Sequence, residues 1–445
     1  MLTSAQCQQT EEDWFYQGVA LADQGKYDEA IKAYDEAIRL DPTIAAAWSN
    51  KGVAFADQGK HDEAIEAYDE AIRLDPTDAA AWGNKGASLA DQGKYDEAIE
   101  AYDEAIRLDP TDAIAWFNKG NSLNKQKKYD ESIKAYDEAI GLNPVLAEPW
   151  IGKGKSLADQ GKYDEAIEAY DEAIRLDPAN VAAWGNKGVS LADQGKYDEA
   201  IEAYDEAIRL DPTDAAVWGN KGVSLADQGK HDEAIEAYDE AIRLDPTDAA
   251  VWGNKGVSLV DQGKYDEAIE AYDEAIRLDP ANAAAWGNKG VSLADQGKYD
   301  EAIEAYDEAI RLDPTDATAW FNKGNSLNKQ KKYDESIKAY DEAIRLNPDL
   351  AEPWIGKGNS LDDQGKHDEA IQAYDEAIRL DSTDANAWYN KGVVLHNQNR
   401  PGSHEAFAKA RELNAAKSIG VSKNETIWSP CRYTLYHFRN KGDHI

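Results

Sequence analysis

Asparagine recurs at one position of a repeating pattern, nine times at intervals that are multiples of 34 residues. Its primary amide carries donors and an acceptor together, which matches the N–H and C=O groups of an extended peptide without reading the peptide's side chains. A spaced row of such amides would therefore bind the backbone of a guest segment. The alternative is that asparagine is a tolerated exposed residue copied with its repeat. The row consists of Asn50, Asn84, Asn118, Asn186, Asn220, Asn254, Asn288, Asn322 and Asn390.

Charged side chains form two further sets with a possible role in binding. A row of aspartates would favour guest segments that carry lysine or arginine. Two lysine-rich stretches interrupt the acidic chain and, each with a preceding phenylalanine, would favour acidic or aromatic segments; charge balance on a solvated surface is the alternative. The row is Asp193, Asp227, Asp261 and Asp295, and the lysine-rich stretches supply Phe117, Lys125, Phe321 and Lys329.

No residue pattern predicts catalysis. The letters GKS at 154–156 resemble the end of a phosphate-binding loop, but Pro149 stands where that motif requires glycine. His61, His231 and His367 are separated by whole repeats, so we interpret them as packing variants rather than metal ligands. The two cysteines lie at opposite ends of the chain and form no metal-binding pair. We therefore expect no enzymatic activity, no cofactor and no metal site.

Tryptophan marks the elements that must position these side chains, since it stands every 34 residues from position 14 to position 388. In one repeat, Trp48, Gly52 and Phe55 lie at i, i+4 and i+7, which is one stripe of a helix. Tyr68 belongs to a second apolar stripe of the same kind, and Gly59 separates the two. Each repeat is therefore predicted to form a helical hairpin.

This pattern resembles the tetratricopeptide repeat over residues 11–418, through the spacing of Trp48, Gly52, Gly59, Ala64 and Pro76 and their equivalents. The resemblance implies an all-α fold, a right-handed superhelix of tandem helical hairpins. No hairpin buries its apolar stripe alone, so neighbouring hairpins must stack into a one-dimensional α-solenoid.

Several side chains of the hairpin can be assigned expected places. Gly52 should leave space where the paired helices meet, and Gly185 should leave room for a guest chain beside its helix. Asp62 is predicted to be the N-cap of its helix. Lys51 is expected to lay its aliphatic stem over the hairpin and to reach acidic neighbours.

In tetratricopeptide arrays the first helix of each repeat lines the concave surface, so the resemblance places the asparagine row in a groove. That groove is similar to the superhelical domain of O-linked N-acetylglucosamine transferases, where asparagines in the corresponding slot hold peptide backbone. Domains that clamp chaperone C-termini need lysine directly after the tryptophan position, and no repeat has it. That binding mode is not expected.

The chain divides into a polar lead-in at 1–10, twelve repeats at 11–418 with a degenerate last one, and a non-repeat segment at 419–445. The final segment either covers the open end of the core or forms a loosely ordered tail. Residues 116–140 are identical to 320–344, six repeats later. This identity indicates that a block of six repeats was duplicated.

The net charge of −38 argues against a nucleic-acid partner, because such binding needs a basic surface. No run is apolar enough to span a membrane and the N-terminus lacks a secretion signal, so a cytoplasmic protein is expected. The sequence favours a non-enzymatic scaffold that binds proteins or extended peptides, basic segments among them. The alternatives are a regulatory or substrate-recruiting arm of a glycosyltransferase complex, and a structural protein that self-associates.

Overall fold

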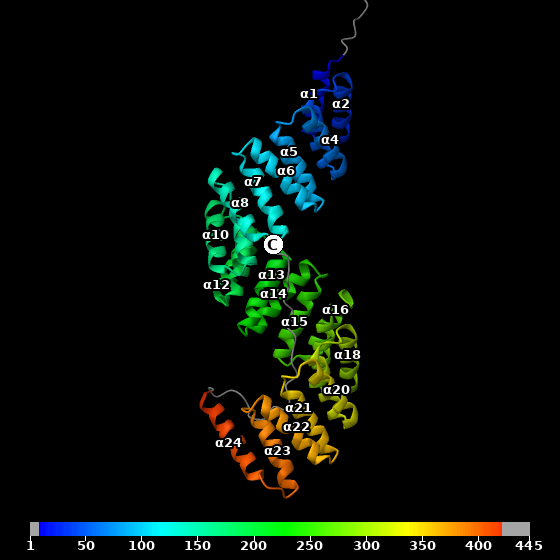
Figure 1. The fold of residues 1–445 in the computed structure, drawn as a ribbon, viewed down its shortest axis with the longest axis vertical. Helices are drawn as coiled ribbons and strands as arrows, with labels where there is room; N and C mark the ends of the chain where they lie inside the picture. Colours follow the sequence, from blue (N-terminus) through cyan, green and yellow to red (C-terminus); the bar gives the residue numbers. More distant parts are fainter. Residues whose placement is uncertain (1–8, 421–445) are drawn as a thin grey trace, which may run out of the picture. The chain divides into compact units, whose positions relative to one another are not determined.

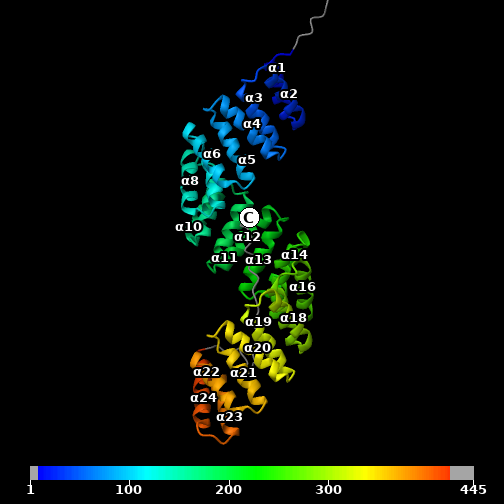
Figure 2. The same ribbon diagram turned by 45° about the vertical axis from the view of Figure 1, so that its right-hand side comes forward.

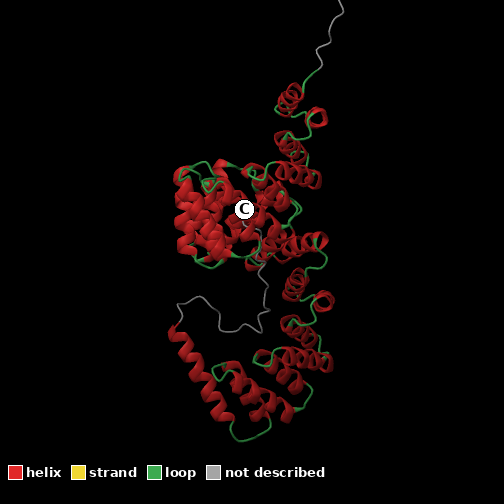
Figure 3. Cartoon of the chain, turned by 45° about the horizontal axis from the view of Figure 1, so that its top comes forward, coloured by secondary structure: helices red, strands yellow, loops and turns green. Residues whose placement is uncertain are grey.

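The structure is a computed structural model that describes residues 9–420, with side chains through 415. All regular secondary structure in these residues is helical (Figure 3), which confirms the predicted all-α fold. The described residues form two compact units, which meet between Pro212 and Thr213. The predicted lead-in lies largely outside the described residues, and so does nearly all of the predicted C-terminal segment.

The first unit contains six hairpins, and each hairpin is one 34-residue repeat (Figure 1). Within the unit, each helix packs against its neighbours along the chain, and first helices also contact the first helix of the next hairpin. The helices are α1 (Glu11–Ala22), α2 (Tyr27–Leu40), α3 (Ala45–Ala56), α4 (His61–Leu74), α5 (Ala79–Asp91), α6 (Tyr95–Leu108), α7 (Ala113–Lys125), α8 (Tyr129–Leu142), α9 (Glu148–Asp159), α10 (Tyr163–Leu176), α11 (Val181–Asp193) and α12 (Tyr197–Leu210).

The second unit repeats this arrangement with six further hairpins, so both units are α-solenoids (Figure 2). Its helices are α13 (Ala215–Asp227), α14 (His231–Leu244), α15 (Ala249–Asp261), α16 (Tyr265–Leu278), α17 (Ala283–Asp295), α18 (Tyr299–Leu312), α19 (Ala317–Lys329), α20 (Tyr333–Leu346), α21 (Glu352–Asp363), α22 (His367–Leu380), α23 (Ala385–Asn397) and α24 (Ser403–Gly420).

A buried tyrosine is the centre of every hairpin except α23–α24, where Phe407 takes its place. The Tyr68 side chain of α4 is 1% exposed, and its ring lies against Gly52 of α3. A Cβ atom at Gly52 would stand 2.6 Å from that ring, so no larger residue fits without movement. The prediction of a close approach at Gly52 is confirmed, although the ring of Tyr68 fills the space.

The turn inside the hairpin requires a left-handed residue. Gly59 has φ +71° and Gly93 has φ +74°, which glycine adopts without a steric penalty. In the two lysine-rich repeats Lys127 and Lys331 stand at this position, with φ 60° and 61°. These two lysines hold a backbone conformation that is costly for a residue with a Cβ atom.

The second helices begin without the predicted cap. Helix α4 starts at His61, and its N-cap residue Lys60 makes no side-chain capping bond. Asp62 instead accepts a hydrogen bond of 2.9 Å from Nε2 of Gln92 in the next repeat. The prediction that Asp62 caps the helix is therefore wrong, because this side chain links two repeats.

Candidate functional site

Three asparagines of the predicted row are accessible in the first unit. Asn50, Asn84 and Asn118 lie on the first helices α3, α5 and α7, one repeat apart, and their side chains are half-buried. None of these amides makes a hydrogen bond to another residue of the described chain. Next to Asn84, a Cβ atom at Gly83 would meet nothing within 4 Å. The three amides are thus free on one layer of first helices, with open space beside Asn84.

The other members of the row have different surroundings. Asn220 is half-buried, whereas four members are buried. Asn390 donates a hydrogen bond of 3.0 Å to Oδ1 of Asn359, which also accepts a 2.8 Å bond from the hydroxyl of Tyr374. The Asn390 amide therefore contributes to the fold. The buried members are Asn186, Asn254, Asn288 and Asn322.

The four aspartates of the predicted row are exposed at the ends of their first helices. Asp261 lies 3.9 Å from Nε2 of His231, and Asp91, at the same position of an earlier repeat, lies 3.8 Å from Nδ1 of His61. Burial raises the pKa of Tyr102, and the charge of Asp91 raises it further. The tyrosines beside these carboxylates therefore remain protonated donors at neutral pH. The row is Asp193, Asp227, Asp261 and Asp295.

The lysine of the WGNKG motif has a structural role. Nζ of Lys187 lies 5.5 Å from the ring centroid of Trp184 and 2.6 Å from Oδ1 of Asp171 in the preceding repeat. Lys51 is placed in the same way, 5.0 Å from Trp48. The prediction that this lysine covers the hairpin and pairs with an acidic neighbour is confirmed. We call this Trp–Lys–Asp arrangement the lysine clip, and within each unit it joins a hairpin to the previous one.

The lysine-rich repeats place their candidate residues unequally. Lys125 and Lys329 are exposed at the ends of α7 and α19. Phe117 is half-buried with its ring centroid 6.0 Å from that of Tyr136. Phe321 is 7% exposed and packs in the same way on Tyr340. The lysines are therefore available to a partner, while the phenylalanines largely extend the core.

A buried polar network joins each lysine-rich repeat to the next repeat. Nδ2 of Asn124 donates a 2.9 Å hydrogen bond to Oγ of Ser156, which lies 3.1 Å from Oγ of Ser132. The Ser132 hydroxyl also bonds the carbonyl oxygen of Gly120 at 2.8 Å. Ser132 and Ser156 are fully buried, so these bonds replace solvent contacts that both hydroxyls lost.

The same network is present in the second unit, among Asn328, Ser336 and Ser360. Sequence reasoning missed it, although a signal existed: Ser132 and Ser336 replace an alanine of the other repeats, and both precede the same AEPWIGKG stretch. The network is therefore a shared feature of the two junctions between a lysine-rich repeat and the repeat that follows it.

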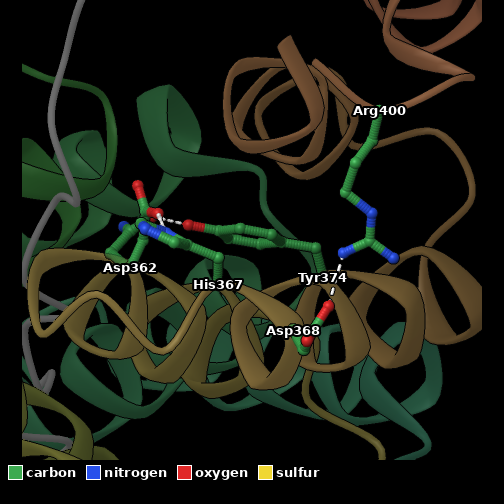
Figure 4. Close-up of polar contacts among 6 residues, drawn as sticks. Asp362, His367, Asp368, Tyr374 and Arg400 are labelled. Carbon is green, nitrogen blue, oxygen red and sulfur yellow. Dashed lines mark hydrogen bonds and ion pairs between the residues drawn. The ribbon is translucent and has the colours of Figure 1, made fainter. Parts of the chain in front are cut away.

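The last two hairpins hold a separate polar cluster (Figure 4). His367 Nδ1 lies 2.7 Å from Oδ1 of Asp362, and Nη1 of Arg400 lies 2.5 Å from Oδ1 of Asp368. No group of three residues suited to a metal is found in the part of the chain that the structure describes. Each of the three histidines lies near one carboxylate: His61 near Asp91, His231 near Asp261 and His367 near Asp362.

Family models described as tetratricopeptide repeat match most of the chain. One matches residues 16–79, 84–147, 151–215, 190–249, 254–317 and 292–351, another matches 67–100 and 237–270, and a model described as TPR repeat matches 358–399. A search of the curated proteins found no match.

Solved structures with similar helical arrays include MamA, which is 26% identical over 36% of this chain and 94% of that chain, with a TM-score of 0.35. YrrB, described as a TPR protein with an unusual peptide-binding site, is 25% identical over 45% of this chain and 99% of that chain, with a TM-score of 0.37. The Cut9–Hcn1 assembly of the APC/C is 17% identical over 92% and 96%, with a TM-score of 0.45. Among the described residues, no helix is long and apolar enough to cross a membrane.

Proposed function

Because the chain belongs to the tetratricopeptide repeat family, we propose that it is a non-enzymatic scaffold that binds extended protein segments along its first helices. The observation that supports this proposal is the set of free, half-buried amides of Asn50, Asn84 and Asn118, one repeat apart, with open space at Gly83 beside Asn84. Each amide can donate to a carbonyl and accept from an N–H group of a guest backbone. The exposed aspartate row and the net charge of −38 favour guests with lysine or arginine.

The first test replaces Asn50, Asn84 and Asn118 with alanine in the full chain. Partners are recovered from native lysate with the unchanged chain, and synthetic peptides that tile each partner serve as probes for calorimetric titration. One net hydrogen bond contributes about 0.5–1.5 kcal/mol, so binding should weaken by about 1.5–4.5 kcal/mol. Replacement of Asn386 and Asn397, which are exposed on α23 and lie outside the row, is the control. Unchanged affinity in the triple variant would show that the asparagines were merely copied with their repeats.

The second test concerns the two exposed lysines, Lys125 and Lys329, which are proposed to bind acidic side chains of a guest. Their replacement with aspartate should weaken the binding of acid-bearing peptides by about 0.5–2 kcal/mol, because exposed ion pairs contribute little individually and reversal adds repulsion. Lys134→Asp and Lys338→Asp, on the second helices of the same repeats, provide the control. Equal losses in both pairs of variants would assign the effect to net charge.

The two alternative roles of the chain predict different experimental results. A regulatory arm of a glycosyltransferase complex would retain a catalytic partner through affinity capture. A self-associating structural protein would show a molar mass that rises with concentration in sedimentation equilibrium. A scaffold for extended segments requires neither result.

A further inference from the structure

The end of the α7–α8 hairpin exposes two apolar side chains, Ile114 and Val145, that other described hairpins do not expose there, beside a leucine that the α1–α2 hairpin also exposes, as Leu40. Ile114 is 63% exposed at the start of α7, Leu142 is 39% exposed at the end of α8, and Val145 is 72% exposed in the loop that follows. The two helices are antiparallel neighbours, so the start of α7 and the end of α8 lie at one end of the hairpin. These three side chains form what we call the apolar end.

A carboxylate at this end lacks its usual partner. In neighbouring repeats an arginine near the end of the second helix pairs with the glutamate three residues before it, as Arg107 pairs with Glu104 at 2.7 Å. Gly141 replaces that arginine in α8. Glu138 is therefore exposed, and no residue of the described chain forms an ion pair with it. The end of the α7–α8 hairpin therefore carries a glutamate without the arginine that pairs with it in neighbouring repeats.

The duplicated block provides an internal comparison. Residues 112–149 and 316–353 differ at three positions, and all three lie at this end of the hairpin. The second copy has polar residues there, Thr318, Arg345 and Asp349, and Arg345 restores the ion pair with its glutamate at 2.7 Å. The copies also differ elsewhere in the six-repeat block, for example at Lys155 and Asn359. Within residues 112–149 and 316–353, however, the differences all lie at this end of the hairpin, so the two copies present different surfaces there.

We propose that the apolar end is a docking site for a segment of another protein that carries an arginine next to aliphatic side chains. The guanidinium of the partner would take the place that Gly141 leaves empty and pair with Glu138. Its aliphatic side chains would cover Ile114 and Val145. An acidic partner is disfavoured, because the chain carries a net charge of −38 and Glu148 is also exposed at this end. The site adjoins the proposed groove, because Ile114 lies one turn before Asn118 on α7. It differs from the groove in using Glu138 and Val145, which the groove does not need.

The test uses the full chain with ¹³C-labelled isoleucine, leucine and valine methyl groups, titrated with the probe acetyl-Arg-Leu-Val-amide. The Ile114 and Val145 signals should shift with increasing probe. Acetyl-Glu-Leu-Val-amide should bind at least about fivefold more weakly, as expected for the loss of one exposed ion pair and its replacement by repulsion. A site of three side chains is small, so binding in the millimolar range is sufficient.

Two reciprocal variants use the duplicated block as its own control. The variant Ile114→Thr, Gly141→Arg, Val145→Asp gives the first copy the residues of the second, and the remaining Val and Leu signals should then stay in place during titration. The variant Thr318→Ile, Arg345→Gly, Asp349→Val should create a second responding site. The proposal is overturned if Ile114 and Val145 do not respond, if the glutamate peptide binds equally well, or if the reciprocal variants respond as the unchanged chain does. Circular dichroism melts establish that both variants are folded.

Discussion

At the scale of single residues, the backbone of Lys127 shows what a repeat loses when its turn glycine is replaced. Lys127 has φ 60°, whereas glycine holds this turn in most repeats. A left-handed residue with a Cβ atom costs roughly 1–2 kcal/mol, and the entropy that glycine loses on folding offsets about half of the gain from removing it. Lys127→Gly should therefore stabilise the chain by about 0.5–1 kcal/mol, measured as a higher thermal midpoint in circular dichroism.

The reverse substitution controls this prediction. Gly93 occupies the same turn one repeat earlier, with φ +74°. A Cβ atom at Gly93 would meet nothing within 4 Å. Gly93→Lys should therefore lower the midpoint through backbone strain alone. If Lys127→Gly lowers the midpoint instead, the lysine side chain makes a stabilising contact that outweighs the strain.

Individual residues also show where sequence reasoning succeeded. The spacing of Trp48, Gly52 and Gly59 was sufficient to predict the hairpin, because each residue type answers a local steric demand. The cap at Asp62 was predicted wrongly, since its partner Gln92 is 30 residues away in the chain and competes with the local backbone for the carboxylate. The local preference of aspartate for a cap position predicts its role only where no residue of a neighbouring repeat forms a hydrogen bond with it.

At the scale of secondary-structure elements, the α7–α8 and α9–α10 hairpins are joined by buried hydroxyl and amide groups as well as apolar contact. The side chains of Asn124, Ser132 and Ser156 are joined there by hydrogen bonds. By contrast, Ser258 of α15 is 1% exposed, and its hydroxyl has no hydrogen-bond partner among the described residues. The same serine position is therefore a bonded group at one junction and an unsatisfied one at another.

This contrast makes a prediction for stability. Ser156→Ala should destabilise the chain by about 1–3 kcal/mol, because it removes a hydrogen bond and leaves buried polar partners behind. Ser258→Ala should be neutral or stabilising, because it removes only an unsatisfied hydroxyl. A double-mutant cycle between Asn124→Ala and Ser156→Ala should give a coupling energy of about 0.5–1.5 kcal/mol from urea denaturation. A coupling near zero would exclude the network as a source of junction stability.

The candidate site could be predicted only in part at this scale. Helical periodicity placed the asparagine row on the first helices, as the structure has it for Asn50, Asn84 and Asn118. It gave no means to distinguish these from Asn390, whose amide bonds Asn359 of the neighbouring hairpin. Whether the amide of a repeated asparagine makes a hydrogen bond depends on the side chain one repeat away. The apolar pattern of a single helix contains no information about that neighbour.

At the scale of the whole molecule, one buried tyrosine in each hairpin from α1–α2 to α21–α22 makes stability depend on alkaline pH. Burial raises the pKa of Tyr34 to about 12, and burial also raises the pKa values of Tyr68, Tyr102 and Tyr136. In the unfolded chain these phenols ionise near pH 10. Above pH 10 the unfolded chain therefore releases protons that the folded chain retains, so folding stability falls as pH rises from about 10 towards the folded pKa values.

We expect the thermal midpoint to be nearly constant up to about pH 9 and to fall steeply between about pH 10 and 12. Each buried phenol contributes up to about 1.4 kcal/mol per pH unit in that window, and the repetition of the hairpin adds these contributions along both units. Phenolate absorbance at 295 nm should be followed together with helicity, so that ionisation and unfolding are compared directly. The chain has 23 tyrosines, and 11 of them are buried in the hairpins. The phenolate absorbance of these buried tyrosines should appear with the loss of helix, and Tyr68→Phe should make the decline in stability less steep. Ionisation of all the phenols while the helices remain intact would contradict this account, because the buried tyrosines would then have lost their protons without unfolding.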